Sequence, residues 1–195
     1  MITVIGLIGL IGAGKTTTAQ YLCGKHGFYR LRFADSLKNM LHTFGLSVDE
    51  IDGSKKNEPC EKLCGKTPRY AMQTLGTAWG RELIGQDVWV EALKRELLCI
   101  SEINVGENKE IKINKFVIDD VRFKNEVRML TNLTLQSDYQ FMPYMIRLHR
   151  DNNREKYNHI SENDLNEYIA DYDIDNNGTI EGLYSTLDRM IGGLM

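Results

Sequence analysis

A glycine-rich segment near the start of the chain has the residue types that bind phosphate groups. Residues 9–16 read GLIGAGKT, which fits the pattern G-x-x-x-x-G-K-[ST] between an apolar run and a helical segment. Glycines let the backbone turn tightly, so that successive N–H groups point inward at phosphate oxygens. We therefore expect this loop to bind the phosphates of ATP. The candidate nucleotide-binding residues are Gly12, Ala13, Gly14, Lys15, Thr16 and Thr17.

Side chains at the end of this loop predict how charge is neutralised there. The Lys15 ammonium would lie near the β- and γ-phosphates, and the Thr16 hydroxyl would help to hold Mg²⁺. A hydrated Mg²⁺ also needs a carboxylate from the end of another strand, and Asp119 and Asp120 follow an apolar run. We assign Asp120 to the metal together with Thr16, although the sequence does not decide between the two aspartates.

The segment of about residues 36–102 carries side chains suited to a phosphorylated acceptor. Arginine forks grip phosphate through two hydrogen bonds, which suits this task better than the point charge of lysine. A phosphate acceptor is mostly ionised at neutral pH, so the site needs charge neutralisation more than it needs a strong base. The candidate acceptor-binding residues, one of them beyond this segment, are Lys38, Arg69, Gln73, Arg81, Asp87, Trp89 and Arg122.

Four of these candidates also have a purely structural interpretation. Arg81 could be a solvated helix charge that pairs with a neighbouring acidic residue, and Arg122 could pair with Glu126 one helical turn later. A tryptophan such as Trp89 is more often a core residue than a platform for a base, and Gln73 could read a base edge or simply lie exposed on a helix. The sequence leaves these alternatives open.

Three further residues complete the expected catalytic set around Lys15. Asp35 follows the second expected strand and would lie near the transferred phosphate, and its alternative role is an ordinary helix N-cap. Arg150 and Arg154 follow the fourth expected strand, in a segment of about residues 150–161 that we expect to close over the phosphates as a lid. Such closure would exclude water and so keep hydrolysis from competing with transfer.

Apolar strand-like runs alternate with helical segments along the chain, which predicts a parallel sheet flanked by helices. Ligands of such sheets bind at the carboxyl ends of the strands, so the motifs that follow the first four strands should converge on one cleft. The expected strands are residues 2–8, 29–33, 116–118, 142–148 and a short one at Ile174. The expected helices are 15–26, 35–44, 67–83, 87–100, 122–133, one opened by a capping box at Ser161 and Asp164, and one from Thr179 onward, with 45–65 irregular.

Composition narrows the class of protein. The 195 residues carry a net charge of −3, with 42% hydrophobic and 26% charged residues, which suits a single soluble domain. Binding of a nucleic-acid polymer normally needs a basic surface, and a membrane span needs roughly 20 apolar residues, so we expect neither partner. No signal peptide precedes the first strand, and the four cysteines lack a metal-site spacing, which favours reduced thiols in the cytoplasm. A switch GTPase is disfavoured because the N-K-x-D guanine motif is missing.

An ordered series of motifs resembles one family, the phage-type deoxynucleoside monophosphate kinases. The resemblance spans nearly the whole chain, and although each motif is weak alone, the ordered set is specific. The matching segments are FADSLK at 33–38, RYAMQTLG at 69–76 followed by Arg81, DVWV at 87–90, DVRFKNE at 120–126, His159 with Ser161 and Glu162, and Ile174, Asn176, Gly178 and Thr179.

The resemblance implies an α/β fold of the P-loop kinase type, in which a central parallel β-sheet is flanked by helices. Residues 1–195 would form one domain with a helical acceptor-binding insertion at about 36–102 and a lid at about 150–161. It also implies Mg²⁺-dependent transfer of the ATP γ-phosphate to a small-molecule deoxynucleoside monophosphate, with Asn176 and Gly178 bordering the adenine.

The resemblance leaves several alternatives. A phage-encoded enzyme would work in the host cytoplasm, and a homodimer is compatible with the sequence, which does not fix the oligomeric state. The alternative acceptors are other phosphorylated metabolites, such as dephospho-coenzyme A or phosphomevalonate. A non-catalytic nucleotide-binding protein is a further alternative.

Overall fold

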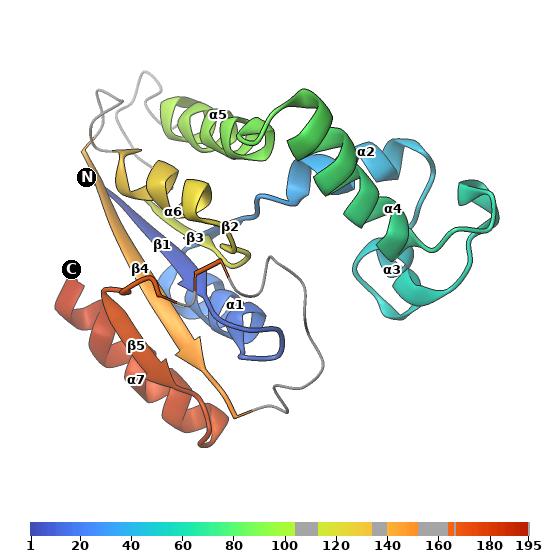
Figure 1. The fold of residues 1–195 in the computed structure, drawn as a ribbon. Helices are drawn as coiled ribbons and strands as arrows, with labels where there is room; N and C mark the ends of the chain where they lie inside the picture. Colours follow the sequence, from blue (N-terminus) through green and yellow to red (C-terminus); the bar gives the residue numbers. More distant parts are fainter. Residues whose placement is uncertain (104–112, 134–139, 152–163, 166, 195) are drawn as a thin grey trace. The chain divides into compact units, whose positions relative to one another are not determined.

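The computed structural model describes residues 1–103, 113–133, 140–151, 164–165 and 167–194 (Figure 1). The chain divides into two compact units, of which the first comprises Met1–Arg32 with Leu97–Met195 and the second comprises Phe33–Glu96. Each unit has its own cluster of buried apolar side chains. None of the described helices is long and apolar enough to cross a membrane.

One parallel sheet forms the centre of the first unit, with the strand order β2-β3-β1-β4-β5 (Figure 1). The strands are β1 (Ile2–Ile8), β2 (Tyr29–Leu31), β3 (Lys115–Ile118), β4 (Phe141–His149) and β5 (Tyr172–Asp175). The predicted parallel sheet is therefore confirmed. The second strand is shorter than predicted: it ends at Leu31, whereas the prediction extended it to Phe33.

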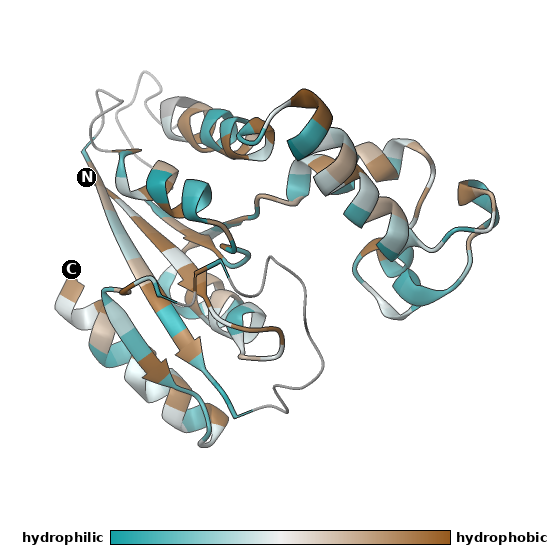
Figure 2. Ribbon diagram, viewed as in Figure 1, coloured by the Kyte–Doolittle hydropathy of each residue, from teal (hydrophilic) through white to brown (hydrophobic). Residues whose placement is uncertain are grey.

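Helices cover both faces of this sheet: α1 (Lys15–His26), α6 (Lys124–Thr131) and α7 (Ile180–Leu194). Ile5 and Leu7 of β1 pack in one cluster with Leu22 of α1 and Leu187 of α7. The opposite face meets α6, because a Cβ on Gly6 would lie 3.1 Å from the side chain of Leu130. Figure 2 shows brown and teal residues alternating around α7, as expected for a helix with one buried face. Helices predicted near 15–26, 122–133 and from Thr179 onward are thus present, and the prediction that helices flank the sheet is confirmed.

The central position of β1 decides where its loop lies. Gly6 is in register with Ile118 of β3 on one side and with Met145 of β4 on the other. Parallel strands end at the same edge of a sheet, so residues 9–14 begin beside Asp119, which follows β3 directly. This register brings the glycine-rich loop and a carboxylate together.

The second unit is helical. It contains α2 (Asp35–Thr43), α3 (Val48–Ile51), the short 3₁₀ turns η1 (Ser54–Asn57) and η2 (Glu61–Leu63), α4 (Pro68–Thr74), the π-helical continuation η3 (Leu75–Ile84), and most of α5 (Val88–Ile103), which continues into the first unit. Thr67 caps α4 as predicted, since its hydroxyl accepts the N–H of Tyr70 at 3.1 Å. The helix predicted for 67–83 is present, but its second half is wound more loosely than an α-helix.

The prediction of an irregular segment at 45–65 was wrong. Ser47 opens α3 with a capping box, in which its hydroxyl accepts the N–H of Glu50 and the Glu50 carboxylate accepts the N–H of Ser47. Leu46 and Ile51 are buried with Leu41 in a small separate core. The polar composition of this segment masks these two apolar side chains, whose burial contributes to ordering its short helical turns.

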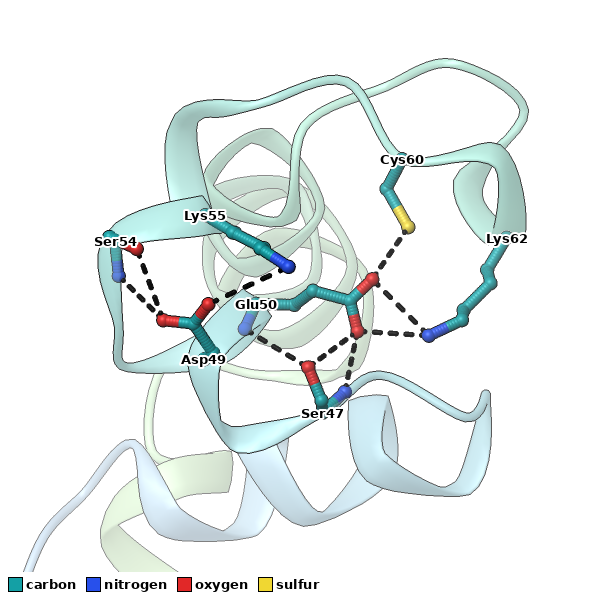
Figure 3. Close-up of polar contacts among 7 residues, drawn as sticks. All are labelled: Ser47, Asp49, Glu50, Ser54, Lys55, Cys60 and Lys62. Atoms are coloured by element: carbon teal, nitrogen blue, oxygen red, sulfur yellow. Dashed lines mark hydrogen bonds and ion pairs between the residues drawn. The ribbon is translucent and has the colours of Figure 1, made fainter.

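A polar cluster around Glu50 fastens this segment together (Figure 3). The carboxylate accepts hydrogen bonds from the backbone N–H of Ser47 at 2.6 Å and from the Lys62 ammonium at 2.9 Å. The Ser47 hydroxyl and the Cys60 thiol donate to the same group at 2.8 and 3.3 Å. These donors, led by the Ser47 backbone, lower the pKa of Glu50 to about 2. Glu50 therefore joins the start of α3 to the turn around η2.

Two helix starts differ from the prediction. Asp35 is not the N-cap of α2: Ala34, whose side chain makes no capping hydrogen bond, takes that position, and Asp35 lies in the first turn. The helix predicted from Arg122 begins at Lys124, because Phe123 is its N-cap and has extended backbone angles (φ −124°, ψ 151°). The backbone N–H groups of Arg122 and Phe123, which precede the helix, donate to the carboxylate of Glu126 at 2.7 and 3.0 Å.

The segment before β5 also departs from the prediction. Ser161 lies outside the described residues, and Asp164 and Leu165 lie in turns rather than in a helix. The Asp164 carboxylate accepts the N–H of Lys124 at 2.8 Å and so caps α6. The aspartate of the predicted capping box thus caps a helix that lies far away in the sequence.

Candidate active site

The glycine-rich loop between β1 and α1 depends on the absence of side chains at two positions. Gly9 and Gly14 have φ values of +148° and +102°, which favour glycine. A Cβ on Gly9 would lie 2.6 Å from the carbonyl oxygen of Leu148, and one on Gly14 would overlap the side-chain nitrogen of Asn176. The loop is therefore pressed against β4 and the turn after β5. Its N–H groups and the amino-terminal end of α1 form a surface suited to anions.

Lys15 is the first residue of α1, and its side chain turns back across the loop. The ammonium donates hydrogen bonds to the carbonyl oxygens of Gly9 and Leu10, the latter at 2.9 Å. The positive charge thus lies over the residues expected to surround phosphate. An anion bound there would meet both this charge and the helix amino terminus.

Thr16 meets one specific carboxylate. Its hydroxyl lies 3.3 Å from Oδ2 of Asp119, which is 4% exposed. The guanidinium of Arg30 grips the same carboxylate, with Nε 2.9 Å from Oδ1 and Nη2 2.5 Å from Oδ2. The sequence-based prediction places Asp120 at the metal, whereas the aspartate that contacts Thr16 in the structure is Asp119.

The donor set at Thr16 and Asp119 fits Mg²⁺. A hydroxyl and a carboxylate oxygen are hard ligands, and Mg²⁺ in nucleotide sites takes one or two protein groups and completes its shell with water and phosphate. No group of three or more His, Cys, Asp or Glu residues that could hold a metal occurs in the described part of the chain. A small donor set of this kind is what a metal shared with a nucleotide needs.

The sequence interpretation missed Arg30. It is the central residue of a three-residue strand, and its register opposite Val117 of β3 brings its guanidinium to the carboxylate two residues further along. A lone charged residue in a buried parallel strand was the available signal. The partner could not be read from the sequence, because it lies 89 positions away.

Cys23 of α1 lies near the same ion pair. Burial raises the pKa of its thiol, the Arg30 guanidinium opposes this effect, and the Asp119 carboxylate raises the pKa further. This thiol therefore stays protonated at neutral pH and is a poor nucleophile. All four cysteines of the chain are free thiols.

The turn after β5 touches the phosphate loop directly. The side-chain amide of Asn176 donates to the carbonyl oxygen of Ala13 at 2.9 Å, and its backbone N–H donates to the carbonyl oxygen of His149 at 2.7 Å. The family resemblance predicts that Asn176 and Gly178 border the adenine of the nucleotide. The structure places the Asn176 amide on the loop itself, while Gly178 is exposed.

Of the segment expected to form a lid, the structure describes only residues 150 and 151. Arg150 follows β4 and is exposed, whereas Arg154 and His159 lie outside the described residues. Arg147 within β4 has a structural role: its guanidinium donates hydrogen bonds to the carbonyl oxygens of Leu165 and Tyr168, the former at 2.8 Å.

Among the acceptor candidates of the second unit, Trp89 is a core residue. It is 4% exposed, its indole N–H donates to the carbonyl oxygen of Gly76 at 2.8 Å, and a Cβ on Gly80 would lie 2.6 Å from its ring. The packing alternative raised from the sequence is therefore the one found. Trp79, which sequence reasoning overlooked, is 38% exposed, and its ring centroid lies 6.1 Å from that of Trp89.

The remaining candidates of this unit differ in their surroundings. Lys38 forms an ion pair with Asp52 at 2.5 Å, so its charge is already engaged. Arg81 donates to the backbone carbonyl of Gln86 at 3.3 Å. Arg69 is half-buried, and Gln73 and Asp87 are exposed on or beside their helices, while Arg122 of the first unit is half-buried.

Asp35 has a second carboxylate near it. Burial raises the pKa of Glu96 on α5, and the negative charge of Asp35 raises it further. A carboxyl group whose pKa is raised by burial and by a nearby negative charge is a familiar arrangement for acid–base chemistry. Glu96 was not among the sequence candidates, because nothing local marks it.

Comparison with known proteins shows the family to which this chain belongs. The family model for deoxynucleotide monophosphate kinases matches residues 56–187, more than half of the chain. A protein of Acanthamoeba polyphaga mimivirus, which bears the name "Putative deoxynucleotide monophosphate kinase", is 34% identical over 191 residues, covering 94% of this chain and 93% of that protein.

Solved structures of two small kinases also align over the chain. An APS kinase of Mycobacterium tuberculosis is 10% identical with a TM-score of 0.48, covering 97% of this chain and 96% of that one. Dephospho-CoA kinase of Campylobacter jejuni is 16% identical with a TM-score of 0.47, covering 99% and 98%. On the evidence of the family model and the viral relative, the chain belongs to the deoxynucleotide monophosphate kinase family.

Proposed function

We propose that this protein transfers the γ-phosphate of ATP to the 5′-phosphate of a deoxynucleoside monophosphate, giving ADP and the deoxynucleoside diphosphate. The observation that carries the proposal is the contact of Thr16 with the buried Asp119 beside a complete phosphate loop, in a chain of this family. The loop supplies anion-binding N–H groups, and the hydroxyl and carboxylate supply ligands for a nucleotide-bound metal.

The donor side would work by positioning and charge. Lys15 would exchange its bonds to the Gly9 and Leu10 carbonyls for the oxygens of the β- and γ-phosphates. Thr16 and Asp119 would hold Mg²⁺, and Arg30 would keep the carboxylate in place. When bound, Mg²⁺ supplies positive charge that offsets the charge of the transferred group.

The acceptor side must overcome the repulsion of two anions. At about 4 Å two unit charges repel by roughly 4 kcal/mol at an effective dielectric constant of 20, so cations are needed on the acceptor as well. We assign this task to Arg69, Arg81 and Arg122, whose planar guanidinium groups can each bind phosphate through two hydrogen bonds. Gln73 and Asp87 are exposed polar residues of the second unit and are our candidates for reading the nucleoside.

Arg150 and Arg154 are proposed to close over the phosphates during transfer. Exclusion of water would direct the γ-phosphate to the acceptor rather than to hydrolysis. The four free thiols favour a reducing compartment, and we infer that the enzyme works in the cytoplasm.

A panel of nucleoside monophosphates tests the proposal. Each deoxynucleotide and its ribose counterpart is incubated with ATP and Mg²⁺, and ADP release and diphosphate formation are measured together. Diphosphate formed from at least one deoxynucleotide, with equal ADP release, supports the proposal. ADP release without a phosphorylated product would identify an ATPase, and neither product would leave a non-catalytic nucleotide-binding protein. Lys15→Ala is the control, expected to abolish transfer without unfolding the chain.

The second candidate is a kinase whose acceptor is an alcohol, and the carboxylates of Asp35 and Glu96 favour it. An alcohol, unlike a phosphate, must lose a proton to become a nucleophile, so one carboxylate would act as general base. Asp35→Asn separates the two candidates. A loss of only several-fold in kcat indicates a phosphate acceptor, whereas a loss of about 100-fold or more indicates an alcohol acceptor.

A further inference from the structure

The side chain of Asn176, which follows β5, forms a hydrogen bond with the phosphate loop near the start of the chain. It is 8% exposed, and its side-chain nitrogen lies 2.9 Å from the carbonyl oxygen of Ala13, a residue 163 positions earlier. Ala13 is itself buried, and its own N–H donates to the carbonyl oxygen of Leu10 at 3.1 Å. The amide of Asn176 therefore fixes a specific peptide group of the loop.

The peptide that it fixes is the one that leads into Gly14. In a trans peptide the C=O of one residue and the N–H of the next point in opposite directions, and no cis peptide occurs among the described residues. A hydrogen bond that holds the Ala13 carbonyl toward Asn176 therefore turns the Gly14 N–H to the other side of the loop. That N–H belongs to the set expected to bind phosphate.

Asn176 is held firmly enough to do this. Its backbone N–H donates to the carbonyl oxygen of His149 at the end of β4, at 2.7 Å. Gly14 offers the amide just enough room, since a Cβ there would overlap the Asn176 nitrogen. The absence of a side chain at Gly14 and the presence of an amide at residue 176 are thus two parts of one contact.

We propose that Asn176 is a positioning residue that orients the Ala13–Gly14 peptide toward the polyphosphate of the nucleotide. This role rests on the proposed function only in that the loop binds a nucleotide. It differs from the expectation that residue 176 borders the adenine, because the contact made by its side chain is with the loop. The ligand whose binding should depend on Asn176 is therefore the phosphate chain, with or without a base.

Two probes separate these roles. ADP carries both phosphates and adenine, whereas inorganic tripolyphosphate carries phosphates alone, and the affinity of each can be measured by titration calorimetry without any acceptor. Asn176→Asp keeps the shape of the side chain, removes the N–H donor and places a carboxylate against the Ala13 carbonyl. We expect it to weaken both ADP and tripolyphosphate by a similar factor of about tenfold or more.

The neighbouring Asn177 provides a matched control. Asn177 is exposed, and its amide bonds to Asp151 rather than to the loop. Asn177→Asp makes the same chemical change one residue away and should leave both affinities within about twofold of the parent protein. A second variant, Asn176→Leu, removes the donor without adding charge and guards against misfolding of the aspartate variant, with the melting temperature recorded for each protein.

The outcomes are distinct. Equal losses for ADP and tripolyphosphate in folded Asn176 variants support the role in positioning the loop. A loss for ADP with unchanged tripolyphosphate affinity would overturn it in favour of a contact with the base, and unchanged affinity for both ligands would also overturn it. Failure of every deoxynucleotide to accept phosphate would refute the proposed function, yet it would leave these binding measurements and their meaning intact.

Discussion

The guanidinium of Arg30 donates hydrogen bonds to both carboxylate oxygens of Asp119, and the same carboxylate accepts a hydrogen bond from the hydroxyl of Thr16. The carboxylate is buried, whereas the guanidinium is 27% exposed. An arrangement of this kind aligns a charged group without leaving it unpaired. It also makes the stability of the first unit depend on a residue of the short strand β2.

Arg30→Gln should therefore destabilise the protein and also impair phosphoryl transfer. Loss of one partner leaves a buried carboxylate unpaired, which costs about 3 kcal/mol, at the low end for buried pairs because Arg30 is partly exposed. Urea unfolding of the parent and the variant measures this cost. The double variant Arg30→Gln/Asp119→Asn removes the stranded charge and should recover part of the lost stability. If the single variant and the parent have the same free energy of unfolding, the ion pair between Arg30 and Asp119 does not stabilise the protein.

The aspartate that serves the metal can be identified by comparing two variants. The contact with Thr16 leads us to expect that Asp119→Asn raises the Mg²⁺ concentration needed for half-maximal rate by about 10- to 100-fold. Asp120→Asn should change that concentration by less than about threefold. The rate is measured as a function of Mg²⁺ at saturating ATP and acceptor. A larger effect at Asp120 would restore the assignment made from the sequence.

The sequence was most informative where a structure is fixed by neighbouring residues. The strand at 2–8 and the helix at 15–26 have the predicted limits, because an apolar run, a glycine-rich turn and a helix cap are local features. Arg30 and the loop contact of Asn176 escaped prediction because their partners lie 89 and 163 residues away. Only the register of the sheet brings such residues together.

The acceptor candidates illustrate the same limit. The spacing of polar residues on a helix does not reveal which side chains are buried, so the sequence does not indicate that Trp79 is more exposed than Trp89. The helix at 67–83 was predicted correctly as an element, but its π-helical half was not, and this winding changes which residues face outward. The roles of the three arginines proposed for the acceptor remain predictions.

Separate replacement of the two tryptophans should distinguish stability from binding. Trp89→Ala removes a buried indole and its hydrogen bond to Gly76, which should cost about 3–5 kcal/mol of folding free energy. Trp79→Ala removes a ring that is 38% exposed and should cost less folding free energy than Trp89→Ala. Because Trp79 is the more accessible indole, its variant should instead raise the KM for the acceptor. Chemical unfolding and initial rates are measured on both, and a KM that responds only to Trp89 would contradict this division.

Glu50 should make the second unit sensitive to acid. Its hydrogen bonds lower its pKa from the ordinary value of 4.5 to about 2 in the folded protein, so the unfolded chain takes up the proton first as the pH falls. The stabilisation is therefore complete above the ordinary pKa, and it is lost as the pH falls from there to about 2. Glu50→Gln should be less stable than the parent at neutral pH, and the difference should shrink across this range.

Urea unfolding between about pH 7 and pH 2.5 measures that difference, and Glu58→Gln serves as the control. Glu58 is an exposed carboxylate of the same segment, and its variant should track the parent at every pH. If the difference between the parent and Glu50→Gln stayed constant down to the acid end of this range, the carboxylate would not be stabilised by the contacts with Ser47 and Lys62. Such a result would mean that the apolar contacts of Leu46 and Ile51 order this segment without help from the cluster.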